Sequence, residues 1–209
     1  KEIVSAGKHA YSEKPLVLSL EEGEDLRKAA HEAGKQIGCA PDTFLGGAHQ
    51  QARALIDEGA IGRVTSGTCH VMSFGLEHWH PNPDFFFKPG AGPILDIGPY
   101  YVANLINLIG PVKRVTAFSS TPRERREMVA SFETLKDIVA HQHSNMEICG
   151  TEGSLYVPDP NFFGGELTLA RRDGARDIVE PWKHPLGVAN WERPNGPPFA
   201  NYRTAGLAD

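Results

Sequence analysis

Apolar positions in the first third of the chain recur with strand and helix periods in turn. The pattern predicts strands at residues 9–12 and 36–40 and amphipathic helices at 19–33 and 48–58. Ser19, followed three positions later by Glu22, is a capping box that begins the first helix, and Gly34 ends it. Strands that alternate with helices in this way are typical of a parallel sheet.

Beyond residue 60 the pattern favours antiparallel strands. Residues 64–74 alternate like a half-buried strand, residues 75–92 form a loop rich in aromatic residues and proline, and residues 93–109 have helical spacing. Further short strands are predicted at 112–119, 146–149, 154–157, 166–170 and 177–179. Short strands joined by turns indicate a largely antiparallel sheet.

Composition and charge exclude two classes of partner. The 209 residues carry 21 Lys and Arg against 26 Asp and Glu, a formal net charge of -5, which argues against nucleic-acid binding. The one dense basic cluster, at residues 123–126, is interpreted as a solvated loop. No apolar run approaches the roughly 20 residues that cross a bilayer, so we expect no membrane partner.

The three cysteines, Cys39, Cys69 and Cys149, lie in apolar, strand-like runs without a C-x-x-C spacing. They are interpreted as reduced core residues of a cytosolic protein, and we therefore expect a cytoplasmic location. The closely spaced histidines have no acidic or thiolate partners at ligand spacing, so we expect no metal site.

Lys14 is the first candidate for chemistry, because it follows a predicted strand and precedes Pro15. Proline removes a backbone donor, stiffens the turn and permits a cis peptide bond. An ammonium group at the C-terminal edge of a strand can orient a substrate hydroxyl and a cofactor ribose together. Taken alone, the segment 13–15 favours a surface turn.

Asp96 and Tyr100 are the second candidate, four positions apart. In a helix both side chains lie on one face near the first turn, where the helix dipole favours a carboxylate. Such a pair can hold a polyol. The alternative is that Asp96 caps the helix and Tyr100 packs in the core.

Three stretches of the chain carry a family resemblance: AGKHAYSEKPL at 6–16, GAGPILDIGPY at 90–100 and GTEGSL at 150–155. Together they resemble the Gfo/Idh/MocA family of NAD(P)-dependent oxidoreductases. The resemblance implies an α/β fold. In it, residues 1–42 are the C-terminal part of a Rossmann-like parallel sheet, and residues 43–209 form an α+β substrate and oligomerisation domain with a mostly antiparallel, open sheet. It also implies NAD or NADP as cofactor, a sugar, inositol or related polyol as substrate, and a homodimer or homotetramer.

Carried over to this chain, the resemblance implies hydride transfer between a nicotinamide and a secondary alcohol, with Lys14, Asp96 and Tyr100 as catalytic residues. Lys14 orients the alcohol and the ribose, Asp96 holds a neighbouring hydroxyl, and Tyr100 takes the hydroxyl proton. The family motif is usually D-x-G-x-H, so Tyr100 stands where a histidine is common. A free phenol has a pKa of about 10 against about 6.5 for imidazole, so Tyr100 needs a cation such as Lys14 beside it. Glu13, Lys14 and Pro15 are the expected cofactor contacts.

Substrate contacts are predicted on loops beside these residues. His78, Trp79 and His80 precede the next predicted helix; an indole face stacks on a sugar ring, and imidazoles bond hydroxyls. Thr43 follows the second strand, where open α/β sheets bind ligands, or it begins the next helix. His49 has the same two interpretations.

A glycine-rich turn that would hold a pyrophosphate is absent from the sequence. We therefore expect a dinucleotide-binding segment upstream of Lys1 and a continuation beyond Asp209. Near residues 121–133 the family has a longer loop and two strands, which are either deleted here or left out of the chain. The alternative to an enzyme is a truncated, non-catalytic copy that binds sugar or packs in an oligomer.

Overall fold

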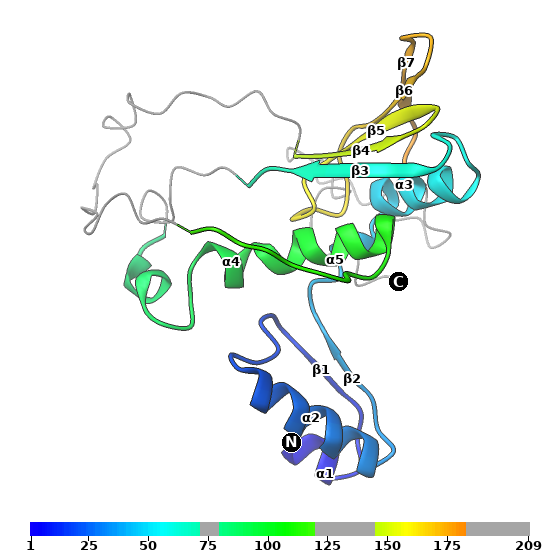
Figure 1. Cartoon of the computed structure of the whole chain (residues 1–209). Helices are drawn as coiled ribbons and strands as arrows, with labels where there is room; N and C mark the ends of the chain where they lie inside the picture. Colours follow the sequence, from blue (N-terminus) through cyan, green and yellow to red (C-terminus); the bar gives the residue numbers. More distant parts are fainter. Residues whose placement is uncertain (72–79, 120–144, 183–209) are drawn as a thin grey trace, which may run out of the picture.

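The computed structural model describes residues 1–71, 80–119 and 145–182 (Figure 1). Its helices are α1 (Glu2–Ser5), α2 (Leu20–Glu32), α3 (Gly47–Asp57), α4 (Pro93–Asp96) and α5 (Gly98–Ile109), with the 3-10 turns η1 (Thr43–Leu45) and η3 (Pro83–Phe87). Its strands are β1 (Ala10–Ser12), β2 (Ile37–Cys39), β3 (Val64–Cys69), β4 (Met146–Gly150), β5 (Gly153–Val157), β6 (Leu167–Arg171) and β7 (Arg176–Val179). Within these ranges no helix has the length and apolar character needed to cross a membrane.

The N-terminal part is a parallel strand pair whose two strands are joined through helix α2. β1 and β2 pair in parallel, with Ser12 opposite Cys39. At the start of α2 the Ser19 hydroxyl accepts a hydrogen bond from the Glu22 backbone N–H at 3.2 Å, which satisfies one of the unpaired donors of the first turn. The predicted β-α-β order is confirmed, and both strands end at the same edge of the pair.

The remaining strands form an antiparallel sheet, in the order β3-β4-β5-β6-β7 within the described ranges. Its register sends alternate residues to opposite faces. Ile148 pairs with Leu155 on one face, and Glu147 pairs with Tyr156 on the other. Ile148 and Leu155 are fully buried, whereas Glu147 and Tyr156 are only half-buried. The sheet therefore has one apolar, buried face and one more polar face.

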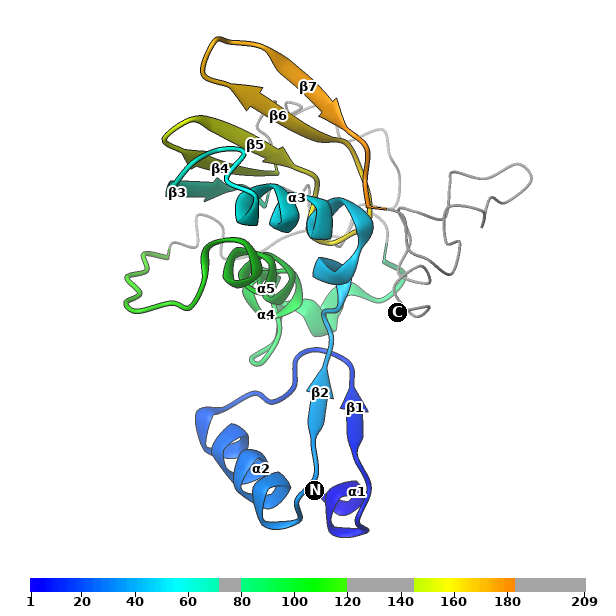
Figure 2. The same cartoon turned by 90° about the vertical axis from the view of Figure 1, so that its right-hand side faces the viewer.

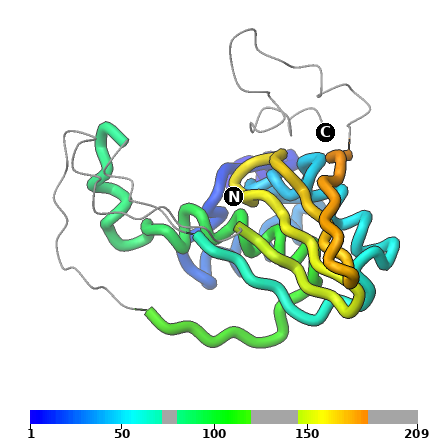
Figure 3. The backbone as a smooth tube through the Cα atoms, turned by 90° about the horizontal axis from the view of Figure 1, so that it is seen from above, coloured from blue at the N-terminus to red at the C-terminus, as the bar shows by residue number. Residues whose placement is uncertain are grey.

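Helices α3 and α5 cover the apolar face of the sheet (Figure 2). Ala52 on α3 and Tyr100, Tyr101 and Leu108 on α5 join the side chains of the sheet in one core, and each is at most 4% exposed. Seen from above, no described helix lies over the opposite face (Figure 3). The N-terminal strand pair lies on the far side of α4 and α5 (Figure 1), so these helices separate the two parts.

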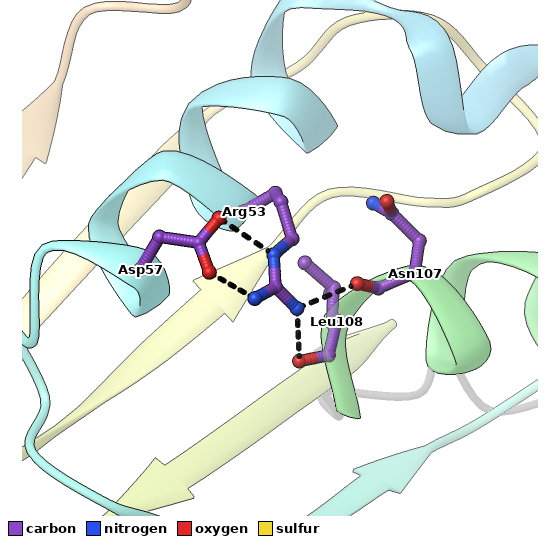
Figure 4. Close-up of polar contacts among 4 residues, drawn as sticks. All are labelled: Arg53, Asp57, Asn107 and Leu108. Atoms are coloured by element: carbon purple, nitrogen blue, oxygen red, sulfur yellow. Dashed lines mark hydrogen bonds and ion pairs between the residues drawn. The ribbon is translucent and has the colours of Figure 1, made fainter. Parts of the chain in front are cut away.

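Arg53 ties helix α3 to the end of α5 (Figure 4). Its guanidinium binds the Asp57 carboxylate, with Nε at 2.9 Å, and donates to the backbone oxygens of Asn107 and Leu108 at 2.9 and 3.3 Å. The last carbonyls of a helix have no partner within it, and a cation there opposes the negative end of the helix dipole. Arg53 therefore sets where α5 ends against α3.

Two predicted elements were wrong. The single helix expected at 93–109 is broken at Ile97, because Pro99 has no N–H with which to continue the hydrogen-bond ladder. The strand expected at 112–119 does not form. No described strand pairs with it, and Val115 and Phe118 are 80% and 97% exposed, so its apolar positions have no surface to pack on.

Some expectations were confirmed only in part. The strand expected at 64–74 forms as β3 but ends at Cys69, and residues 72–79 lie outside the described residues. The cysteines are free, but each is only partly buried: Cys39 lies at a strand end and Cys149 on the uncovered face of the sheet, not in the core. The basic cluster at 123–126, the join at 121–133 and the C-terminal end also lie outside the described residues.

Replacing Arg53 with methionine keeps the aliphatic stem but removes the guanidinium. We expect the free energy of unfolding to fall by about 1 to 2 kcal/mol, because two carbonyls at the end of α5 lose charged donors. Urea unfolding measures the change. The control is Arg27→Met, since Arg27 pairs with Glu24 on the exposed surface of α2. Equal unfolding free energies for the two variants would contradict the stabilising role of the Arg53 contacts with α5.

Candidate active site

Lys14 lies just beyond the end of β1 and reaches across to helix α4. Its Nζ donates a hydrogen bond to the backbone oxygen of Asp96 at 2.8 Å and forms an ion pair with the Asp96 carboxylate. The Lys14 side chain is 13% exposed and that of Asp96 is 35% exposed. The Lys14–Pro15 peptide bond is cis. An ammonium group from the N-terminal part is thus held against the helical layer.

The break between α4 and α5 provides an acceptor for Lys14. In an unbroken helix the Asp96 carbonyl would accept the Tyr100 N–H. Here the Tyr100 N–H donates to the Ile97 oxygen at 3.1 Å instead. The Asp96 oxygen is left for the Lys14 ammonium. The Pro99 that breaks the helix therefore also builds this part of the site.

Tyr100 also lies beside the Lys14 ammonium. Lys14 Nζ is 5.4 Å from the centroid of the Tyr100 ring, a cation–π contact. The ring belongs to the core and is 2% exposed. The structure therefore brings Lys14, Asp96 and Tyr100 together, as expected from the sequence, with the cation over the face of the ring. Their catalytic roles stay predictions.

The remaining residues predicted near the cofactor and the strand edge lie in two environments. Glu13 is exposed, and its carboxylate accepts a hydrogen bond from the Lys14 backbone N–H at 3.1 Å. Pro15 follows Lys14 at the same edge of the strand pair. Thr43, the first residue of η1, is 1% exposed, so the chain itself covers it. Thr43 therefore contacts a ligand only if η1 moves.

The loop residues predicted to bind substrate are described only in part. His80 accepts a hydrogen bond from the Asn82 backbone N–H at 3.1 Å, and its ring meets Phe85 edge to face with centroids 5.2 Å apart. His78 and Trp79 lie outside the described residues. Within the described ranges, no group of three or more His, Cys, Asp or Glu side chains could hold a metal ion.

His49 on α3 is fully buried and makes two directional hydrogen bonds. Its Nε2 lies 2.8 Å from the Phe162 backbone oxygen, and its Nδ1 lies 2.9 Å from the Asn104 amide nitrogen. A carbonyl oxygen only accepts, so Nε2 carries the proton and Nδ1 accepts from Asn104. Burial lowers the pKa of His49, which keeps the ring neutral. The Asn104 side-chain oxygen is buried without a hydrogen-bond partner in the described structure.

Tyr101, next to Tyr100 on α5, has a different partner. Its hydroxyl donates to the Asp159 carboxylate at 3.0 Å and accepts from the Asn145 amide at 3.3 Å. Burial raises the pKa of Tyr101, and the nearby Asp159 charge raises it further. Tyr101 therefore stays protonated and anchors the helix, whereas the neighbouring tyrosine faces Lys14.

The start of helix α3 is filled by other parts of the chain. A Cβ atom on Gly46 would lie 2.0 Å from the Phe163 backbone oxygen, and one on Gly47 would lie 2.2 Å from the Trp182 backbone oxygen. The two glycines thus allow close backbone approach. A helix start can bind a phosphate only if its N–H groups face open space. This glycine pair therefore does not form a pyrophosphate site.

The GFO/IDH/MocA C-terminal domain profile matches residues 49–156, more than half of the 209 residues. The chain belongs to the Gfo/Idh/MocA family. The fold agrees with this. The structure of levoglucosan dehydrogenase in complex with NADH and levoglucosan superposes with a TM-score of 0.69 at 24% identity, covering 98% of this chain and 63% of that chain.

Two curated relatives resemble shorter stretches of the chain. The scyllo-inositol 2-dehydrogenase (NADP(+)) IolW of Bacillus subtilis is 28% identical over 136 residues, 64% of this chain and 37% of that protein. The D-xylose dehydrogenase of Paenarthrobacter nicotinovorans is 30% identical over 126 residues, 58% of this chain and 32% of that protein. The chain thus spans about a third of the length of these relatives.

Sequence reasoning missed the polar contacts that hold α5. A signal existed for Asn104, because it is a polar residue one turn after Tyr100 on a strongly apolar helix. Nothing in the sequence indicated that Asp159 would meet Tyr101, since 58 residues separate them.

Proposed function

We propose that the chain is part of an NAD- or NADP-dependent oxidoreductase that transfers a hydride between a nicotinamide and a secondary alcohol of a sugar, inositol or related polyol. The observation that carries the proposal is the meeting of Lys14, Asp96 and Tyr100 where the two parts of the chain join. Family membership and the similarity to an inositol and a xylose dehydrogenase support it. The end of a Rossmann dinucleotide-binding domain at 1–42 and a substrate and oligomerisation domain at 43–209 belong to the same proposal.

Lys14 orients the alcohol. An ammonium group has three N–H donors, and the contacts with the Asp96 oxygen atoms use two of them. The third is available for a substrate hydroxyl or a ribose hydroxyl. Because Asp96 already fixes the lysine side chain, little conformational freedom is lost when the alcohol binds.

In this proposal Asp96 binds a second substrate hydroxyl, and Tyr100 transfers the proton. One carboxylate oxygen of Asp96 pairs with Lys14, and the other can accept a hydrogen bond from a neighbouring substrate hydroxyl. In its phenolate form Tyr100 takes the proton of the reacting alcohol and becomes the neutral phenol, and the Lys14 ammonium over its ring stabilises the negative charge of the phenolate. Tyr100 is 2% exposed, so in this proposal the substrate contacts only a small part of its side chain.

The described residues fit one end of the cofactor. Glu13, Lys14 and Pro15 lie at the C-terminal edge of β1, where open α/β sheets bind ligands, and would hold the nicotinamide ribose. When bound, the nicotinamide ring supplies the hydride chemistry. The start of α3 does not fit a pyrophosphate, because backbone atoms fill it. We expect that group to bind residues outside the described ranges.

We also propose that the protein assembles as a dimer or tetramer through the uncovered face of the sheet. This face includes Tyr156, with Arg176 over its ring, and Ile178, which is 71% exposed. A second copy would remove such apolar surface from water. Light scattering at micromolar concentration checks the assembly, and a monomer would contradict it.

In the complete protein, Lys14→Met should reduce turnover by about 10²-fold or more without changing the circular dichroism spectrum, because it removes the group that orients the alcohol. Rates are measured with NAD+ and NADP+ on a panel of polyols that includes D-xylose and scyllo-inositol. The matched control is Lys28→Met, on the exposed surface of α2.

Wild-type turnover in folded Lys14→Met would contradict the role of Lys14. If the complete protein, with whatever segment precedes Lys1, neither turns over any polyol nor binds either dinucleotide, the alternative holds, and the chain is a sugar-binding or oligomer-packing domain.

Tyr100→Phe should lower turnover by about 10²-fold to 10⁴-fold, since it keeps the ring but removes the transferable proton. Tyr100→His should retain more activity than Tyr100→Phe, and the pH dependence of its turnover should move towards the imidazole pKa of about 6.5. Tyr101→Phe is the control. It should lower stability, because Asp159 loses the hydroxyl donor of Tyr101, but leave the pH-rate profile unchanged. A Tyr100→Phe profile equal to the wild type would assign Tyr100 to packing alone.

A further inference from the structure

A buried polar contact connects helix α3 to α5 close to the candidate site. His49 and Asn104 are both fully buried, and their hydrogen bond joins the two helices. His49 is held in turn by the Phe162 backbone oxygen. The contact requires one tautomer of His49 and one orientation of the Asn104 amide, so it is compatible with one relative placement of the helices.

This contact lies one helical turn from Tyr100. Tyr100 and Asn104 are four positions apart on α5, so their side chains share a face. On α3, Arg53 is likewise four positions after His49, and it holds the end of α5. Two consecutive turns of α3 therefore bind α5 through directional hydrogen bonds. Because α5 begins two residues after Asp96, the placement of α5 also affects the position of Asp96.

Stability alone does not explain the His49–Asn104 contact. The unpaired Asn104 oxygen is buried, and a buried polar atom without a partner costs free energy. Two apolar side chains of similar shape would avoid this cost. Apolar packing, however, allows a helix to slide or turn slightly, whereas a donor and an acceptor in one geometry do not.

We propose that His49 is a positioning residue: through Asn104 it sets the placement of α5, and with it the placement of Tyr100 and Asp96 against Lys14. A catalytic benefit of this placement rests on the proposed function. The placement itself is a property of the chain and can be measured without cofactor or substrate.

The test measures how easily the Lys14 amine reacts. In the wild type, Asp96 holds the Lys14 side chain at 13% exposure, whereas Lys28 is 73% exposed and serves as an internal reference. Each variant is treated with a trace of acetic anhydride, and mass spectrometry gives the acetylation ratio of the two lysines. Thermal unfolding and, with a polyol and dinucleotide, kcat and KM are measured in parallel.

Three variants separate positioning from stability. His49→Phe removes both hydrogen bonds of the ring. His49→Gln keeps a donor for Phe162 and an acceptor for Asn104. The double variant His49→Phe/Asn104→Leu replaces both side chains with apolar groups and removes the unpaired Asn104 oxygen. It should therefore recover part of the melting temperature that His49→Phe loses, while the Phe162 oxygen still lacks its donor. Leu167→Ala is the control, since it destabilises the shared core at β6 without removing a polar contact of α5.

We expect His49→Phe to raise Lys14 acetylation about threefold or more and to lower kcat about tenfold or more with a smaller change in KM, because the reacting groups are misplaced. His49→Gln should restore both values. The double variant should regain part of the melting temperature but not the wild-type acetylation ratio. Leu167→Ala should lose stability with an unchanged ratio. If His49→Phe does not fold, Asn104→Leu gives the same comparison, because His49 then loses its donor.

An acetylation ratio that stays at the wild-type value in folded His49→Phe or Asn104→Leu would overturn the proposal. So would a double variant that regains the ratio together with its stability, since His49 would then contribute to folding alone. If the ratios change as expected but the complete wild-type protein has no dehydrogenase activity, the positioning role stands and the proposed function fails.

Discussion

The ion pair between Lys14 and Asp96 joins the two parts of the chain where the helical layer is broken. Of the ion pairs in the described ranges it is the least exposed, so water screens it least. The N-terminal strand pair and the broken helix both determine the geometry of this ion pair. The chain leaves β1 two residues before Lys14, and the helix break ahead of Pro99 frees the Asp96 carbonyl from the helical ladder. One proline thus makes a backbone acceptor beside a carboxylate.

Around this ion pair the fold supplies rigidity through polar contacts along α5. Asp159 holds Tyr101 near the start of the helix, His49 holds Asn104 in the middle, and Arg53 holds the last carbonyls. Apolar contact with the sheet supplies most of the burial but little directional information. The polar contacts determine how the helix is turned, and Tyr100 projects from it toward the lysine.

Local signals in the sequence predicted most elements, because capping at Ser19 and alternation in the sheet strands depend on neighbouring residues alone. The strand at 112–119 failed because a strand needs a partner, and no described strand lies beside it. Asp96 and Tyr100 were identified with the site from their spacing and the family resemblance, but the helix between them was expected to be continuous. The contact of His49 with Asn104 could not be read from the sequence, since it depends on how two helices are placed in three dimensions.

The central claim is that Lys14 and Asp96 act as one unit that joins the N-terminal strand pair to the helical layer. A double-mutant cycle with Lys14→Met, Asp96→Asn and the combined variant tests it most directly, using the free energy of unfolding from urea titration. The account predicts that the two losses are not additive, with a coupling free energy of about 1 kcal/mol or more. Additivity to within about 0.5 kcal/mol would contradict it.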